Sequence, residues 1–248
     1  KKDDSDLTYL WHCRLGHINL KRLERLQKEG ILEPFDLEDY GKCESCLLGK
    51  MTKQPFSKVG ERANELLGLI HTDVCGPMST NARGGFSYFI TFTDDFSRYG
   101  YVYLMKHKSE SFDKFKEFQS EVENQLGKKI KALRSDRGGE YLSYEFDDHL
   151  KECGILSELT PPGTPQWNGV SERRNRTLLD MVRSMMGQAK LPLEFWGHAL
   201  NTAALTINRA PSKAVEKTPY ELWFGKPPNV SFLKIWGCEV YVLSLIHI

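Results

Sequence analysis

Three acidic residues have the types and the spacing for metal-dependent phosphodiester chemistry. Asp73 and Asp136 each close an apolar stretch typical of a β-strand, and Glu172 stands at the start of a strongly helical stretch. Because 35 residues separate Asp136 from Glu172, the three form a D,D(35)E pattern. Carboxylate oxygens suit two Mg²⁺ or Mn²⁺ ions, which activate an attacking water or 3′-hydroxyl and stabilise the leaving oxygen. These residues, called the acidic triad below, predict a two-metal site for in-line attack on a phosphodiester.

Other acids compete for the first position of the triad. Asp94 and Asp95 also lie near a strand end, and the residues alone do not exclude them as ligands. Asp is common in turns, so a turn role is the better interpretation for at least one of them. Glu140 is too close to Asp136 in the chain to take the place of the helical Glu172.

A second metal-ligand pattern stands near the N-terminus. His12 and His17 are separated by four residues, and Cys43 and Cys46 by two, with 25 residues between the pairs. Imidazole and thiolate ligands at such spacings favour tetrahedral Zn²⁺. A segment this short can hardly bury a sufficient core, so a metal would stabilise its fold. These four residues, called the HHCC cluster, predict a structural zinc site, with Cys13 as a spare thiol.

Length, charge and cysteine usage set outer limits on the class of protein. The 248 residues allow one large domain or a small one plus a medium one, and 40% hydrophobic content is enough for a core. The 34 basic and 33 acidic residues leave a net charge of +1, so any DNA-binding surface must come from local asymmetry. The cysteine spacings and the lack of a signal peptide favour a reduced, intracellular protein, and the non-Met start suggests a piece of a longer polypeptide.

Periodicity divides the chain into a short helical module and an α/β core. The predicted domains are an HHCC module over 1–58, a core over 59–230 and the truncated start of a C-terminal region over 231–248. A mixed sheet with flanking helices follows from the alternation of elements in the core. The expected strands are 66–74, 86–93, 98–105, 130–135 and 155–159. The expected helices are one that carries Leu20, Leu23 and Leu26 and stops at Gly30, one around 112–118, 144–151, 170–188 and 193–208, and an extended tail follows residue 210.

The helix over 170–188 is expected to carry chemistry on one side and packing on another. A helical wheel places Leu178, Met181, Val182 and Met185 in one apolar stripe, with Glu172 on its flank. Arg176 and Arg183 fall along nearly the same line as Glu172, which suits contacts with DNA phosphates, although a solvated basic face is the alternative. The basic residues of this stretch that are DNA-contact candidates are Arg173, Arg174, Arg176, Arg183 and Lys190.

Several sequence blocks resemble the integrases of copia-type long-terminal-repeat retrotransposons and, more distantly, retroviral integrases. The resemblance covers roughly residues 7 to 242, and its blocks are 71–78, 92–98, 135–141, 168–173, 218–225 and 236–238. It implies a ribonuclease-H-like fold behind a GAG-pre-integrase HHCC zinc module, with Asp73 as the first catalytic residue. It also implies DNA as partner (element ends and target), a homo-oligomer, and a place in a Gag-Pol polyprotein. The implied location is a cytoplasmic virus-like particle and then the nucleus.

The leading functional hypothesis is a DNA integrase that trims 3′ ends and joins them to target DNA. A plain nuclease of the same fold and a non-catalytic, domesticated nucleic-acid-binding fragment are the alternatives. Trp167 stands before Asn168 where the family usually has a polar residue. Both are DNA-contact candidates, Trp167 by stacking on an unpaired base, although packing on the protein is the favoured interpretation for the Trp. A further basic cluster, at Lys128, Lys129 and Lys131, offers another path for DNA.

Overall fold

A five-stranded mixed sheet lies at the centre of the computed structural model, which describes residues 7–35, 43–49, 62–160 and 168–239. The strand order is β3-β2-β1-β4-β5. β2 pairs antiparallel with both β1 and β3, whereas β4 pairs parallel with both β1 and β5. The strands are β1 (Ile70–Cys75), β2 (Tyr88–Asp94), β3 (Gly100–Met105), β4 (Ala132–Ser135) and β5 (Leu156–Leu159).

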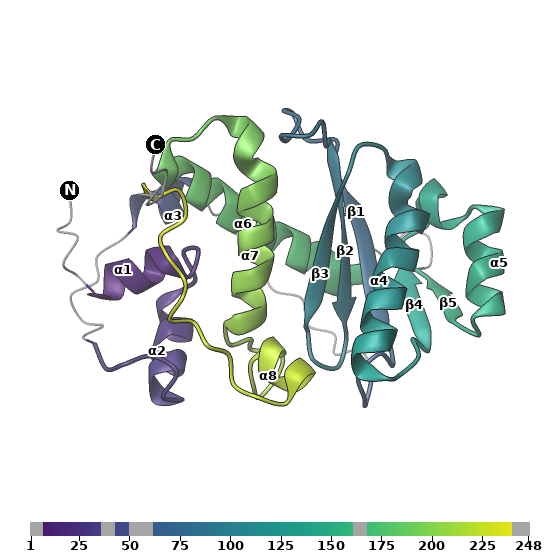
Figure 1. The fold of residues 1–248 in the computed structure, drawn as a ribbon, viewed down its shortest axis with the longest axis horizontal. Coiled ribbons are helices and arrows are strands. Elements are labelled where there is room, and N and C mark those ends of the chain that lie inside the picture. The colour runs from purple at the N-terminus through teal and green to yellow at the C-terminus, as the bar shows by residue number, and fades with distance from the viewer. Residues whose placement is uncertain (1–6, 36–42, 50–61, 161–167, 240–248) are drawn as a thin grey trace, which may run out of the picture.

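Helices cover both faces of this sheet (Figure 1). α4 (Ser111–Leu126) and α5 (Tyr144–Glu152) lie on one face, and α6 (Gly169–Ala189) and α7 (Trp196–Arg209) lie on the other. An antiparallel three-strand meander followed by parallel strands joined through helices is the ribonuclease-H-like arrangement. The predicted fold class is therefore confirmed.

Successive residues of a strand point alternately into two separate hydrophobic cores, one on each face of the sheet. On β2, Ile90 and Phe92 point into the core under α4 and α5, while Phe89 points into the core under α6 and α7. Phe92 stacks on Phe118 of α4, with ring centroids 4.5 Å apart. The period of two along the strand explains why neighbouring residues serve opposite faces.

The N-terminal module, made of α1 (Leu7–Arg14), α2 (Leu20–Lys28) and α3 (Glu44–Gly49), packs on α6 and α7 rather than standing alone. Its Leu15, Leu23 and Leu26 are fully buried in the same hydrophobic cluster as α6 and α7. The helix predicted from Leu20, Leu23 and Leu26 is confirmed as α2. Its N-terminus is capped by Asn19, whose side chain accepts a hydrogen bond from the Arg22 N–H. The module thus shares its hydrophobic core with α6 and α7. Its predicted boundary at residue 58 lies outside the described residues.

Close contact at two glycines seats the module on α6. Gly16 has a positive φ of 61°, and a Cβ there would come within 2.8 Å of the Met181 side chain. A Cβ on Gly49 would come within 2.8 Å of the Ser184 hydroxyl. Larger residues at these positions would push the module away from the helix.

The C-terminal part differs from the predicted extended tail. Residues 219–224 form a short helix, α8 (Pro219–Phe224), which the sequence analysis missed. Its signals were present: Thr218 caps the helix, Pro219 takes the first turn, and Gly225 ends it in a left-handed conformation. Val230 and Leu233 then return to the core shared with the N-terminal module.

The other predicted elements are confirmed with shifted ends. β1 begins at Ile70 and not at 66, because Leu67 adopts a positive φ of 63° that no strand accommodates. The expected helix over 193–208 is a 3₁₀ turn, η4 (Leu193–Phe195), followed by α7. α1 and α3 were not predicted. None of the helices in the described ranges has the length and apolar character needed to cross a membrane.

Candidate metal centres

The sheet register places the first two acids of the triad at one edge. β1 and β4 run parallel, with Ile70 opposite Leu133 and His71 opposite Arg134. Continued by two residues, this register sets Asp73 opposite Asp136, just past the end of β4. The carboxyl ends of parallel strands meet at the same edge of a sheet, so the two carboxylates face a common space.

The first turn of α6 brings the third acid and an amide to the same edge. Glu172 is exposed in that turn, and Asn175 follows it by three residues on the same face of the helix. The Asn175 amide nitrogen donates to Asp73 Oδ2 at 2.9 Å, and its Oδ1 accepts from the Thr91 hydroxyl at 2.9 Å. Asn175 thereby ties α6 to β1 and β2 and fixes one oxygen of Asp73.

The electrostatics of this edge favour cation capture. Burial first, and then the charges of Asp136 and Glu172, raise the pKa of Asp73 to about 7, against the hydrogen bond from Asn175. Like charges that cannot separate resist ionisation, and a bound cation relieves them. Among the described residues, however, the triad is not gathered into a close ligand cluster of the kind the HHCC residues form.

Asp94 and Asp95, the competing acids, lie at the other end of β1. Asp94 pairs with Ile70 across the sheet, three residues or roughly 10 Å along the strand from Asp73. Both carboxylates are occupied. Asp94 accepts hydrogen bonds from the backbone of Leu67 and from Ser97, and Asp95 accepts from His71 at 2.9 Å and pairs with Arg98 at 2.8 Å. Their geometry is that of turn and packing residues, as the Asp-in-turn interpretation anticipated.

The HHCC cluster has the geometry of a tetrahedral zinc site. Zinc bonds of about 2.0–2.3 Å place neighbouring tetrahedral ligand atoms about 3.3–3.8 Å apart. His12 Nε2 lies 3.1 Å from His17 Nδ1 and 3.2 Å from Cys46 Sγ. His17 Nδ1 lies 3.4 Å from Cys43 Sγ and 3.7 Å from Cys46 Sγ. All four ligand atoms lie within 4.8 Å of one another, so the cluster is compatible with zinc.

Outer partners fix which histidine nitrogen faces the centre of the cluster. His12 Nδ1 donates to the Ile18 carbonyl at 2.8 Å, which leaves Nε2 for a metal. His17 has the opposite arrangement: Nε2 donates to Gln188 Oε1 on α6 at 2.8 Å and leaves Nδ1. Hydrogen bonding from Cys46, with further contributions from His12 and His17, holds the pKa of the Cys43 thiol well below its usual range despite burial. Thiolate is the form that binds zinc.

Two predicted DNA-contact residues are engaged with the protein. Asn168 is 2% exposed, and its amide donates to the Thr72 carbonyl at 3.3 Å, tying the start of α6 to β1. Arg183 Nε donates to the Gly49 carbonyl at 3.0 Å, and its guanidinium pairs with Asp180. Arg183 thus joins α6 to α3. Trp167 lies outside the described residues.

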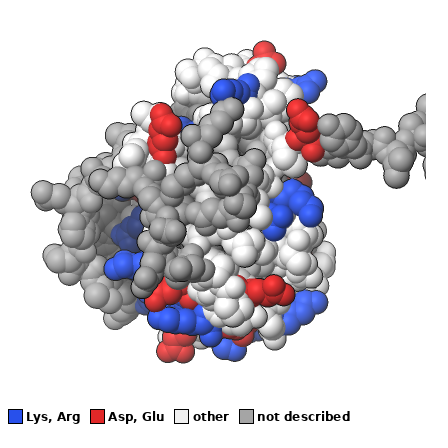
Figure 2. All heavy atoms as spheres, turned by 90° about the vertical axis from the view of Figure 1, so that its left-hand side faces the viewer, with Lys and Arg blue, Asp and Glu red and all other residues white. Residues whose placement is uncertain are grey.

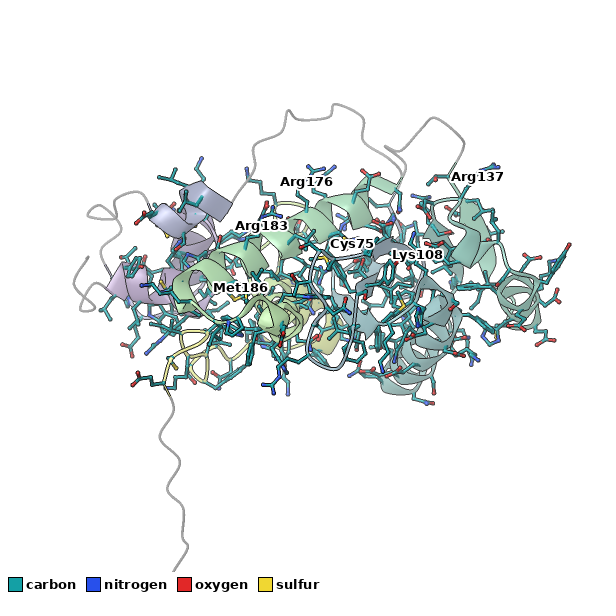
Figure 3. All side chains as sticks on the ribbon, turned by 90° about the horizontal axis from the view of Figure 1, so that it is seen from above. Cys75, Lys108, Arg137, Arg176, Arg183 and Met186 are labelled. Carbon is teal, nitrogen blue, oxygen red and sulfur yellow. The ribbon has the colours of Figure 1, made fainter. Side chains whose placement is uncertain are left out.

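The remaining basic candidates divide into surface and interior. Arg176 is half-buried and lies on the same side of α6 as Arg183 (Figure 3), while Arg173 and Lys190 are exposed. Arg174 is a correction: it is 8% exposed and donates to the Arg98 carbonyl and to Asn208 at 2.7 Å. The helical wheel did not account for carbonyls of β3 and an amide of α7 that receive this guanidinium.

Charge elsewhere is balanced. Lys128 and Lys131 pair with Glu65, and Lys129 pairs with Glu123, so the predicted alternative cluster is largely neutralised. Figure 2 shows the end of the molecule that carries the N-terminal module, where the visible basic and acidic side chains are interspersed. Both signs of charge are thus mixed on the part of this face that the structure describes.

Comparisons with known proteins agree with this architecture. Residues 1–51 match the GAG-pre-integrase domain, and residues 63–165 match the integrase core domain. The chain is 44% identical over 233 residues to the retrovirus-related Pol polyprotein from transposon TNT 1-94 of Nicotiana tabacum, covering 94% of this chain and 18% of that protein. It is 34% identical over 233 residues to the Pol polyprotein from transposon RE2 of Arabidopsis thaliana, covering 93% of this chain and 16% of the relative.

A similar fold is seen in a solved structure. A chain of the simian T-cell lymphotropic virus intasome in complex with PP2A regulatory subunit B56 gamma aligns with a TM-score of 0.57 and 20% identity, over 75% of this chain and 65% of that one. At this identity the likeness concerns the fold alone. The chain spans less than a fifth of the length of the two plant relatives.

Proposed function

The chain belongs to the family of copia-type retrotransposon Pol polyproteins that carry GAG-pre-integrase and integrase core domains, and on that premise we propose that it is a DNA integrase. Its proposed reaction trims the 3′ ends of element DNA and joins them to target DNA by transesterification. The alternative is a non-catalytic, domesticated fragment of such a polyprotein.

One observation carries this proposal: the parallel register of β1 and β4 sets Asp73 opposite Asp136, and Asn175 of α6, one turn after Glu172, donates to Asp73 Oδ2. Burial first, and then the charges of Asp136 and Glu172, raise the pKa of Asp73 to about 7. A carboxylate in that setting gains when a divalent cation replaces its proton. Mg²⁺ or Mn²⁺ held by the triad would supply a metal-activated nucleophile and stabilise the leaving oxygen.

The protein's own groups orient the site. Asn175 donates to Asp73 Oδ2 and fixes that oxygen. In the turn after Asp136, the backbone N–H of Gly138 donates to Asp136 Oδ1 at 3.0 Å. Glu172 is exposed in the first turn of α6, and its charge acts on Asp73. No covalent enzyme intermediate is required in a direct displacement.

We further propose that the HHCC cluster binds one structural Zn²⁺ per chain. Closed four-ligand sites of Cys and His serve folding rather than catalysis. We also propose that the protein acts as a homo-oligomer on DNA, as part of a longer Gag-Pol polyprotein. Its expected location is a cytoplasmic virus-like particle before integration and the nucleus during it.

The test is a strand-transfer assay with short DNA duplexes that mimic element ends, in Mg²⁺ and in Mn²⁺. Asp73→Asn, Asp136→Asn and Glu172→Gln keep side-chain size but remove charge, so each should reduce both trimming and joining by at least about 10³-fold. Asp148→Asn, at an exposed acid on α5, is the matched control and should leave activity unchanged.

The outcomes separate the candidate functions. Joining that is lost in the triad variants alone supports the integrase. Trimming without joining would indicate a plain nuclease, and DNA binding with neither reaction would indicate the non-catalytic fragment. Loss of activity in Asp94→Asn with full activity in Asp73→Asn would overturn the assignment of the first ligand.

A further inference from the structure

Gln188, in the last turn of the helix that begins near Glu172, contacts two residues of the N-terminal module at once. Its Oε1 accepts from His17 Nε2 at 2.8 Å, and its Nε2 donates to Cys13 Sγ at 3.2 Å. The chain separation between Gln188 and these partners is 171 and 175 residues. Gln188 therefore joins the integrase core to the HHCC cluster by side-chain hydrogen bonds.

The two contacts of Gln188 set the orientation of its amide. The amide nitrogen faces the Cys13 sulfur, a weak acceptor, and the amide oxygen faces His17. An amide turned the other way would place its NH₂ against the proton on His17 Nε2 and its oxygen against sulfur. The observed orientation thus keeps an acceptor on His17.

That acceptor decides which nitrogen of His17 can bind a metal. An amide oxygen cannot donate, so it holds the His17 proton on Nε2 and leaves the Nδ1 lone pair directed into the cluster. His17 Nδ1 is the atom that lies 3.1 Å from His12 Nε2 and 3.4 Å from Cys43 Sγ. Outer hydrogen bonds of this kind orient metal-binding histidines and raise their basicity.

The backbone at His17 makes this support more important. His17 has a positive φ of 62°, an uncommon conformation for a residue with a Cβ, and it follows Gly16 at φ 61°. One turn earlier on α6, Ser184 donates to the Ser45 carbonyl at 3.4 Å and Arg183 to that of Gly49. The C-terminal half of α6 thus lies beside α3 (Figure 1) and contacts both that helix and His17 of the cluster.

We propose that Gln188 is a positioning residue of the zinc site, so that the site is completed by the core helix and not by the module alone. This inference rests on the proposed binding of zinc by the HHCC cluster. Its consequence is reciprocal: zinc binding holds the C-terminal half of α6 against the module, and that half of α6 holds zinc.

The experiment measures zinc affinity of the full chain by competition with a chromophoric chelator. Gln188→Met keeps length without a comparable acceptor and should weaken zinc binding by about 10- to 100-fold, as should Gln188→Ala. Gln188→Glu keeps an acceptor for His17 while losing the donor to Cys13, so it should bind zinc at least as tightly as the unchanged protein. Gln119→Met, at a buried core glutamine of α4 remote from the cluster, should have no effect.

A second readout separates positioning from packing. Cobalt in place of zinc reports ligand geometry through its visible absorption. The spectrum should be altered in Gln188→Met and restored in Gln188→Glu, whereas a merely structural loss would lower thermal stability equally in both without changing the spectrum.

The outcomes are distinct. If Gln188→Met or Gln188→Ala folds and binds zinc as tightly as the unchanged chain, the proposal is wrong while the zinc site stands. If either is unfolded and Gln188→Glu is folded with full zinc affinity, the acceptor role is supported. If the unchanged chain binds no zinc, both the HHCC assignment and this inference fail.

Discussion

The two ends of α6 carry two candidate metal centres of opposite design. Glu172 belongs to the open, acidic one and Gln188 to the closed HHCC one, 16 residues or roughly 24 Å apart along the helix. In the HHCC cluster the four ligand atoms are gathered within 4.8 Å of one another, and outer hydrogen bonds to Ile18 and Gln188 orient the two imidazoles. In the acidic triad the ligands repel one another, as the raised pKa of Asp73 indicates.

This difference indicates what each centre contributes. When the protein supplies all four ligands, metal binding stabilises the folded state. An open carboxylate site leaves coordination positions of the metal for the substrate. Loss of zinc should therefore cost stability. Loss of Mg²⁺ should cost activity and leave the fold unchanged. The predictions below address that contrast, beginning with the largest expected effect.

Zinc removal should destabilise the module and the half of α6 that supports it. A chelator is expected to lower the free energy of unfolding by on the order of 5 kcal/mol, because the binding energy is part of the folding energy. Amide hydrogen exchange should show lost protection in α1, α2 and residues 181–188. β1 to β3 and α4 should keep theirs, because these strands also pack on the core under α4 and α5, to which no described residue of the module contributes. Loss of amide protection across the whole chain would mean that the N-terminal module and the sheet unfold together.

Asn175→Leu should selectively damage the acidic centre. Without the amide that holds Asp73 Oδ2, cation binding loses its preset geometry, and we expect a loss of about 10- to 100-fold in strand transfer. Zinc content serves as the control, since the HHCC cluster lies at the other end of α6 and does not depend on that bond. A variant with full activity and an increased Mg²⁺ requirement would restrict Asn175 to metal affinity. No change in either property would contradict its role.

Asp73→Asn should stabilise the protein when divalent cations are absent. The folded pKa of about 7 lies above the ordinary 3.8, so the native state binds more protons than the unfolded state between these values, and stability falls as the pH rises from 4 to 7. Removing the charge should gain up to about 4 kcal/mol near pH 8 and nothing below pH 4. Denaturant unfolding at both pH values measures this. If Asp73→Asn lowered the free energy of unfolding at pH 8, the ionised Asp73 carboxylate would not be a source of instability in the folded protein.

Arg176→Glu should weaken DNA binding at every sequence and reduce the salt slope by about 1, as expected for a lost phosphate contact. Arg173→Glu is the matched change at an exposed residue that points about 100° away from Glu172 on the helical wheel, and it should matter less. Titrations over a range of salt concentrations compare the two. Equal slopes for Arg176→Glu and the unchanged protein would place the DNA path elsewhere.

The sequence was a better guide to the candidate metal ligands at the sheet edge than to the residues that hydrogen-bond to those ligands in either centre. Strands and their ends followed from period-two patterns and from turn residues such as those after Asp94 and Asp136. Asn175 was within reach of prediction, because it stands one helical turn from Glu172. Gln188 was not, since nothing in its neighbourhood signals a contact with His17 across 171 residues. Arg174 was misassigned because helical angle alone ignores buried acceptors such as Asn208.

Domain organisation was the least predictable feature. A short segment with a zinc pattern was expected to depend on its metal, yet Leu15, Leu23 and Leu26 are buried with Leu178 and Met185 of the core helix. The apolar stripe on α6 was recognised, but its partner was not, because an amphipathic pattern specifies a buried face and not what covers it. Tertiary packing alone reveals that both centres share one helix.

The most direct test of the two-centre account is anomalous X-ray diffraction from crystals of the zinc-loaded protein soaked in Mn²⁺. Data collected at the two metal edges distinguish the ions. The account predicts a zinc peak among His12, His17, Cys43 and Cys46, and manganese between Asp73 and Asp136 with Glu172 on its open side. Manganese bound at Asp94 and Asp95, or zinc absent from the HHCC cluster, would contradict it.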